Sequence, residues 1–179
     1  MVFPCPVGPT KAMLVSTGAE AVETAVKISR KWAYEVKGID TYKAKIIVCE
    51  NNFHGRTTTI ISFSNDPVAR KNFGPYTEGF IKIEYDNLQA LEAALESSAD
   101  IAGFLVEPIQ GEAGVVVPFD GYMAEVKKLC EKYNVLFELV IPRERILKGP
   151  ISGVGIQSIF PGVAGLYLPV KIPLIPTEI

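Results

Sequence analysis

The sequence predicts an α/β domain with a mostly parallel sheet and helices on both faces. Two observations carry this prediction. Short strand-like runs alternate along the chain with segments of helical period, as in consecutive strand–helix–strand units. Most of those runs are apolar throughout instead of alternating with polar residues, which is typical of strands buried on both faces.

The composition narrows the class of protein and of partner. Of the 179 residues, 48% are hydrophobic and 21% are charged, as in a globular domain. The net charge of −2 gives no electrostatic basis for binding nucleic acid or an anionic membrane. No apolar run is long enough to cross a bilayer. The start resembles neither a secretory signal nor an arginine-rich presequence, so we expect a cytoplasmic protein, with the mitochondrial matrix as the alternative for a longer parent.

The cysteine and histidine content predicts that the chain holds no metal. Cys5, Cys49 and Cys130 are widely spaced and odd in number, which favours reduced thiols in a cytosol-like compartment. Cys49 lies in an apolar run and Cys130 on a predicted helix, so we expect both to be buried and inert. His54 is the sole histidine and cannot build a His-rich metal site.

The first elements are predicted around a helix that begins near Gly18. Residues 1–12 hold three of the thirteen prolines and are predicted to form a loop. The apolar run Met13–Val15 predicts a strand, and a small polar turn follows it. Thr17 and Glu20 have the spacing of a capping box. The helix that follows has one apolar face, made by Ala21, Ala25, Ile28 and Trp32.

Further strands and helices alternate along the rest of the chain. One helix is predicted to be capped by Asn87 and a later one by Asp120. The predicted strands are Ile46–Glu50, Ile60–Ser64, Phe80–Glu84, Ile101–Val106 and one that begins at Val135–Phe137.

Three unusual turns follow predicted strands: Thr17–Ala19, Phe53–Arg56 and Glu107–Gly114. In open parallel sheets, ligands bind outside the carboxyl ends of the strands, so these turns are predicted to face one crevice. A helix N-terminus at Thr17–Ala19 would offer free amides and a positive dipole end to a phosphate. An ordinary capped helix that binds nothing is the alternative, and it is the commoner outcome for a capping box taken alone.

The pattern changes from Glu138 onward. Residues 138–179 contain six prolines, and no helical period survives there. A buried strand should continue at the start of this segment, yet charges lie close together at Arg143 and Arg145. Such disagreement between local signals and the preceding pattern indicates an altered or mis-joined reading of a longer gene.

Four motifs follow one another along the chain: STGAEAVETAVKISRKW, NNFHGRT, FGPY and VEPIQGEAGVVVP. This ordered set resembles the class III pyridoxal-phosphate aminotransferases, and it spans about residues 12–137 in the family's order and spacing. Within the family, the ornithine enzymes are most similar and the acetylornithine enzymes next. The resemblance implies an incomplete large domain of fold-type I at residues 13–137, between the loop at 1–12 and a divergent, proline-rich tail at 138–179.

The resemblance also implies pyridoxal phosphate as cofactor and names the residues that hold it. In the family, backbone amides of the turn matching Thr17, Gly18 and Ala19 bind the cofactor phosphate. The aromatic residue matching Phe53 stacks on the pyridine ring, and the carboxylate matching Glu107 lies near it. From the residues alone, Phe53 would more often be a core aromatic and Glu107 a solvated carboxylate.

Three further residues are implied to shape the substrate side of the site. The arginine matching Arg56 grips the substrate α-carboxylate, a role that suits a planar, two-pronged donor; from the residues alone, a surface charge is the alternative. The carboxylate matching Glu112 pairs with a gate arginine in the ornithine enzymes. His54 lies beside the stacked ring, where we expect it either to shape the pocket or to be a satisfied turn histidine.

The residues that would make the cofactor reactive are missing from the pattern. After its matching strand, the family carries an Asp-Glu-x-Gln-x-Gly motif whose aspartate keeps the pyridinium nitrogen protonated. This chain has Glu138 near that position and no aspartate after Asp120. The tail lysines, Lys148 and Lys171, lack the context of the family's Schiff-base lysine. We therefore predict no catalytic residue in this chain and no normal transamination by it alone.

Two functions remain as hypotheses. In the first, the chain is a piece of an aminotransferase that moves the amino group of ornithine to a 2-oxo acid. Its partners would be amino acid and 2-oxo acid substrates, and the intact family forms homodimers or larger assemblies. In the second, the chain is a non-catalytic, phosphate-binding fragment that associates with an intact aminotransferase subunit through an unfinished sheet edge.

Overall fold

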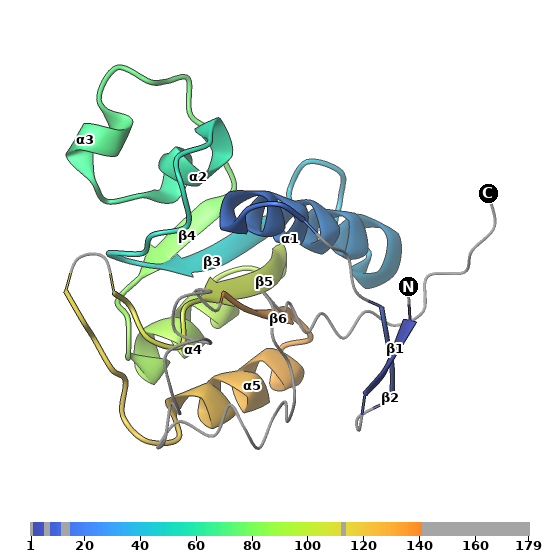
Figure 1. The fold of residues 1–179 in the computed structure, drawn as a ribbon. Coiled ribbons are helices and arrows are strands. Elements are labelled where there is room, and N and C mark those ends of the chain that lie inside the picture. Colours follow the sequence, from blue (N-terminus) through green and yellow to red (C-terminus); the bar gives the residue numbers. More distant parts are fainter. Residues whose placement is uncertain (1, 6–7, 12–14, 112–113, 141–179) are drawn as a thin grey trace.

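A four-stranded parallel sheet forms the centre of the domain. The computed structural model describes residues 2–5, 8–11, 15–111 and 114–140 (Figure 1). Every pair of neighbouring strands in this sheet is parallel, which confirms the predicted α/β class. In spatial order the strands are β4 (Phe80–Ile83), β3 (Lys45–Cys49), β5 (Ile101–Val106) and β6 (Leu136–Leu139).

Helices cover both faces of the sheet, as predicted. Figure 1 shows α1 on one face and α4 with α5 on the other. The elements are α1 (Gly18–Trp32), continued by the π-helical turn η1 (Ala33–Lys37), α2 (Thr58–Phe63), α3 (Pro67–Arg70), α4 (Leu88–Glu96) and α5 (Tyr122–Lys132). Gly38 ends η1 in the left-handed conformation, at φ 83°, where a residue without a Cβ is favoured.

The continuous apolar runs of the central strands serve two separate cores. On β3, Ile46 and Val48 pack into the core under α1 and α2, whereas Ile47 and Cys49 pack into the core under α4 and α5. All six residues of β5 are buried. Each core side chain of this size stabilises the fold by about 1.5–3 kcal/mol through removal of apolar surface from water. A strand that feeds both cores has no solvent face, which explains why its sequence does not alternate.

The predicted caps are confirmed for two helices and wrong for a third. Thr17 and Glu20 form both hydrogen bonds of the capping box at the start of α1. The side chain of Asn87 accepts a backbone hydrogen bond at the start of α4. At α5, however, the cap position is Gly121, at φ 94°, and no described side chain caps the helix. Asp120 lies one residue too early to reach the first turn.

The predicted strand at Ile60–Ser64 is wrong, because these residues lie in the short helix α2 and its cap. The Thr57 side chain accepts a hydrogen bond from Ile60 N at 3.4 Å and so begins the helix. Ile60 and Phe63, three residues apart, both pack into the core under α1. A run as short as these five residues, three of them apolar, cannot distinguish a buried strand from one buried helical turn, and here the cap decides.

The predicted loop at residues 1–12 is also corrected. Val2–Cys5 (β1) pairs with Gly8–Lys11 (β2) as an antiparallel hairpin separate from the main sheet. Each strand of a two-stranded hairpin keeps one unpaired edge, where the missing amide of a proline is tolerated. Most of the strand predicted at Met13–Val15 and the tail at 141–179 lie outside the described residues, and Val15 itself has no regular structure. No helix in the described part of the chain is both long and apolar enough to cross a membrane.

Candidate functional site

Direct contacts join the three turns that the sequence singled out. The Phe53 amide, in the turn after β3, donates to Glu107 Oε2, after β5, at 3.3 Å. Gly55 lies against Ala19 at the start of α1 so closely that a Cβ on Gly55 would be 2.9 Å from the Ala19 Cβ. The described parts of these turns therefore meet where the parallel strands end, the usual place of a ligand site in such sheets.

The start of α1 presents backbone amides to open space. The Glu20 carboxylate accepts from the amides of Ser16, at 2.7 Å, and Thr17, at 2.9 Å. It therefore does not occupy the amides of Gly18 and Ala19, which are the next two in the chain. A Cβ on Gly18 would meet none of the described atoms within 4 Å. Exposed amides at the positive end of a 15-residue helix form a favourable site for a phosphate.

Phe53 and Glu107 form a platform beside this helix end. The Phe53 side chain is 40% exposed, whereas Glu107 is only 4% exposed. The hydrogen bond from the Phe53 amide holds the turn onto the buried carboxylate. The Tyr85 hydroxyl donates to the carbonyls of Glu107 and Pro108, each at 3.0 Å, and so fixes the backbone just after β5. A half-exposed ring on a fixed turn can stack on a flat ligand.

His54 packs inward, beneath the turn. It is buried, its ring centroid lies 5.9 Å from that of Phe63, and neither ring nitrogen has a hydrogen-bond partner among the described residues. Burial lowers the pKa of His54 to about 4, so the imidazole is neutral at physiological pH. This geometry favours the prediction that His54 shapes the pocket, and a neutral, buried ring is poorly placed for proton transfer with a ligand.

Arg56 belongs to the described part of the chain, and Glu112 does not. The Arg56 side chain is exposed at the end of the turn, next to the cap of α2. Within the described ranges its guanidinium has no hydrogen-bond or ion-pair partner, so its five donors are available to a ligand there. Glu112 lies outside the described residues. Among the described residues, no group of three or more His, Cys, Asp or Glu side chains could hold a metal.

Sequence reasoning missed several residues that hold the turns together. The Gln110 side chain donates to the carbonyl of Glu50 at 2.8 Å and so ties the turn after β5 to the end of β3. The hydroxyl of Thr57 donates to the carboxylate of Glu23 on α1. The glycine between His54 and Arg56 was a visible signal for a close backbone approach. Nothing in the sequence marks Glu23, because its partner lies 34 residues away.

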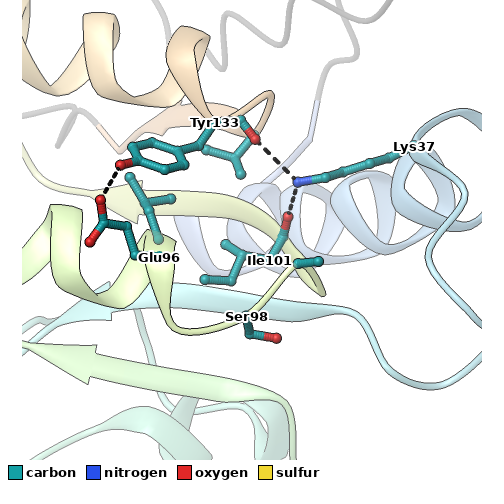
Figure 2. A pocket seen from close by; sticks show the side chains of 8 residues that line it. Lys37, Glu96, Ser98, Ile101 and Tyr133 are labelled. Atoms are coloured by element: carbon teal, nitrogen blue, oxygen red, sulfur yellow. Dashed lines mark hydrogen bonds between the residues drawn. The ribbon is translucent and has the colours of Figure 1, made fainter.

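A pocket of about 410 Å³ lies at the opposite, amino-terminal end of the strands, between α4 and η1 (Figure 2). Its lining includes Ile101, which begins β5, and Val135, just before β6. The Lys37 ammonium donates to the carbonyls of Ile101, at 2.7 Å, and Tyr133, at 3.5 Å. Burial lowers the pKa of Lys37, and the nearby carboxylate of Asp100 offsets part of this decrease. Because the Lys37 ammonium already donates to two backbone carbonyls, it is poorly placed to bind a ligand. The joined turns are therefore the better candidate site.

Comparison with known proteins decides the family. The family model for class III aminotransferases matches residues 4–139, which include all of the joined turns. The chain belongs to the class III aminotransferases. Fold and family agree, because a solved member of the family matches this chain structurally over 70% of its length.

The most similar relatives include ornithine aminotransferases. That of Plasmodium falciparum (isolate 3D7) is 54% identical over 130 residues, which are 73% of this chain and 31% of the relative. The mitochondrial enzyme of Drosophila melanogaster is 54% identical over 127 residues, 71% of this chain and 29% of the relative. This aminotransferase chain therefore spans about a third of the length of the curated relatives it matches.

Solved structures give the same assignment. The ornithine aminotransferase of Toxoplasma gondii ME49 matches with a TM-score of 0.68 and 52% identity, over 70% of this chain and 30% of that one. The acetylornithine aminotransferase of Elizabethkingia anophelis matches with a TM-score of 0.55 and 49% identity, over 70% and 26% of the two chains. Another structure of the Toxoplasma gondii enzyme has partial occupancy of pyridoxal phosphate at its active site.

Proposed function

We propose that this chain carries part of an aminotransferase site for pyridoxal phosphate and ornithine. The part consists of the backbone amides of Gly18 and Ala19 (the phosphate cup), the ring of Phe53 that stacks on the cofactor, and Arg56, which binds the substrate carboxylate. The observation that carries the proposal is the pair of contacts, Ala19 with Gly55 and Phe53 with Glu107, that joins the three turns. The relatives' names supply ornithine as the amino donor, and the family reaction supplies a 2-oxo acid as the acceptor.

The described residues fit one end and one face of the cofactor. The amides of Gly18 and Ala19, beside the cap residue Thr17, would bind its phosphate. Phe53, which is 40% exposed, would stack on its ring, and Arg56 would form paired hydrogen bonds to the substrate carboxylate. Glu107 would act through the turn, by holding the Phe53 amide. When bound, pyridoxal phosphate supplies an electron sink for the substrate carbon that carries the amino group.

The fit does not extend to the groups that make the cofactor reactive. Glu138, the carboxyl nearest to the family's aspartate position, is fully buried and accepts a hydrogen bond from Ser29 on α1. It is therefore a core group in this chain, not a partner for a ring nitrogen. Lys148 and Lys171 lie outside the described residues. We infer that the chain binds the cofactor without a covalent lysine and does not transaminate alone.

Cofactor titration tests this proposal directly. We expect pyridoxal phosphate to bind the chain, and pyridoxal, which lacks the phosphate, to bind at least about tenfold more weakly. Gly18→Asp should abolish the difference, because it places a carboxylate in the open space at the helix end. Asn65→Asp adds the same charge at an exposed loop position before α3 and should preserve the difference. Equal binding of both compounds would contradict the phosphate cup.

Borohydride treatment tests the missing lysine. After reduction of the mixture with pyridoxal phosphate, peptide mass spectrometry should find no stoichiometric adduct. A stoichiometric adduct at Lys148 or Lys171 would refute the inference that this chain lacks a cofactor lysine.

The alternative is a non-catalytic fragment that associates with an intact aminotransferase subunit. The observation that favours it is the sheet, in which β4 and β6 each pair on one side only within the described residues. Such edges are templates for further strand pairing. Co-purification with a full-length aminotransferase would support association, whereas a monomer that stays separate at high concentration would refute it.

A further inference from the structure

Two contacts fasten the turn that carries Arg56 onto α1. The first is the close approach of Gly55 to Ala19, described above. The second is the hydrogen bond that the Thr57 hydroxyl donates to the Glu23 carboxylate. Ala19 and Glu23 are four residues apart and so lie on one side of the helix. Arg56 is therefore held between two points of attachment, one on each side of it in the sequence.

The second contact also fixes the start of α2. The Thr57 hydroxyl has one proton to donate and lone pairs to accept with. Because the proton goes to Glu23, the oxygen faces Ile60 N at 3.4 Å and caps α2. Ile60 and Phe63 then anchor α2 in the core that α1 shares. A single carboxylate on α1 thus sets both the hydroxyl orientation and the position of the turn.

We propose that Glu23 is a positioning residue that fixes the spacing between the phosphate cup at Gly18–Ala19 and the carboxylate-binding Arg56. The inference rests on the proposed function, because it assumes a ligand with a phosphate at one end and a carboxylate at the other. Such a ligand gains affinity from both ends only when the two subsites are held at a fixed distance. A turn released from α1 would have to be ordered again on each binding event.

The test compares two stable compounds on the full chain. Phosphopyridoxyl-ornithine carries the phosphate, the ring and the α-carboxylate, whereas pyridoxamine phosphate carries only the first two. We expect the unsubstituted chain to prefer the former, and Arg56→Leu to remove the preference. Glu23→Ala should lower the preference about tenfold while leaving the affinity for pyridoxamine phosphate nearly unchanged.

Conservative variants separate positioning from a general loss of folding. Glu23→Gln keeps a side-chain oxygen that can accept from Thr57, so it should retain most of the preference. Thr57→Ser should retain it for the same reason, and Thr57→Val, which has no hydroxyl, should lose it. Glu35→Ala is the matched control, because Glu35 lies on η1 and pairs only with exposed Lys31, at 3.4 Å, among the described residues.

The possible outcomes separate a failure of the positioning role of Glu23 from a failure of the proposed function. If neither compound binds the unsubstituted chain, the proposed function fails and the inference fails with it. If both bind with the expected preference and Glu23→Ala leaves that preference intact, the positioning role alone is overturned. If Glu23→Ala weakens both compounds equally, Glu23 supports the fold and does not set the spacing, which also overturns the inference.

Discussion

The buried carboxyl of Glu138 makes the stability of this domain depend on pH in a calculable way. Its side chain is fully buried in β6, where one carboxyl oxygen accepts from Ser29 and the other has no hydrogen-bond partner within the part of the chain that the structure describes. Burial raises the pKa of Glu138 from 4.5 to about 7, and the Ser29 hydroxyl offsets part of the rise. The folded state therefore holds its proton over a pH range in which the unfolded chain has lost it.

The sign and size of the effect follow from linkage. Because the folded pKa lies above the unfolded one, the contribution to stability is complete below pH 4.5 and is lost as the pH rises through about 7. The free energy of unfolding should fall by about 1.4 kcal/mol per pH unit between these values, roughly 3 kcal/mol in all.

His54 acts in the opposite direction over nearly the same range. Burial lowers its pKa from 6.5 to about 4, so its contribution is complete above pH 6.5 and is lost as the pH falls towards 4. The slope is again about 1.4 kcal/mol per pH unit. Between pH 4.5 and 6.5 the two slopes cancel, so the unsubstituted chain should show a nearly flat profile there and a decline only from about pH 6.5 to 7.

Urea unfolding of the unsubstituted chain and of Glu138→Gln, at intervals from pH 4.5 to 8, measures this directly. The amide cannot titrate and can still accept from Ser29, so the variant should become more stable by roughly 3 kcal/mol as the pH rises to 6.5, and then level off. Glu131→Gln, an exposed carboxylate on α5, should follow the unsubstituted chain. Parallel profiles for the chain and Glu138→Gln across the whole range would refute the assignment.

Two further predictions follow from packing. Gly55→Ala should lower the free energy of unfolding by about 2–4 kcal/mol in urea titrations, because its Cβ would lie 2.9 Å from that of Ala19 and its φ of 120° disfavours any side chain. Gly18→Ala, where no described atom lies within 4 Å of the new Cβ, should change the free energy of unfolding by less than about 0.5 kcal/mol. Equal effects of the two substitutions would contradict the contact between Gly55 and Ala19. Cys49 and Cys130 should resist a thiol reagent at pH 8 until urea unfolds the chain, because both side chains are buried. Burial also raises the pKa of both thiols, that of Cys130 to about 12. Fast labelling of either cysteine in the folded state, located by peptide mass spectrometry, would argue against their burial.

The elements that the sequence predicted correctly have local causes. β3 and β5 were predictable because strands with no solvent face need apolar residues at every position. The capping box of α1 was predictable because both partners lie within one turn of chain. Residues 60–64 were misassigned because a short apolar run fits either period, and the deciding contact is the Thr57 cap.

The site was predictable only in part, because most of its contacts join residues that are far apart in the sequence. The order of strands and turns placed Phe53, Gly18 and Glu107 at one end of the sheet. It could not show that the Phe53 amide, not a solvent molecule, bonds Glu107, since the two are 54 residues apart. Nor could it show that Glu20 leaves the amides of Gly18 free by turning back to Ser16. Contacts of long sequence separation depend on the folded geometry and leave no periodic signal.

The distribution of these contacts bears on what a third of an aminotransferase can do. Every described contact that joins the turns lies between Ala19 and Gln110, and the two cores beneath them are made by the same stretch of chain together with residues 122–140. On the proposed function, the binding half of the site is thus built by contacts internal to this chain. On the same proposal, covalent and pyridinium chemistry would need a lysine and an acid. Glu138, the carboxyl nearest to the family's aspartate position, is held in the core by Ser29, and Lys148 and Lys171 lie outside the described residues. On that proposal, binding and chemistry would be separable, because the contacts that would position the phosphate site and the ring of Phe53 are made within the described residues.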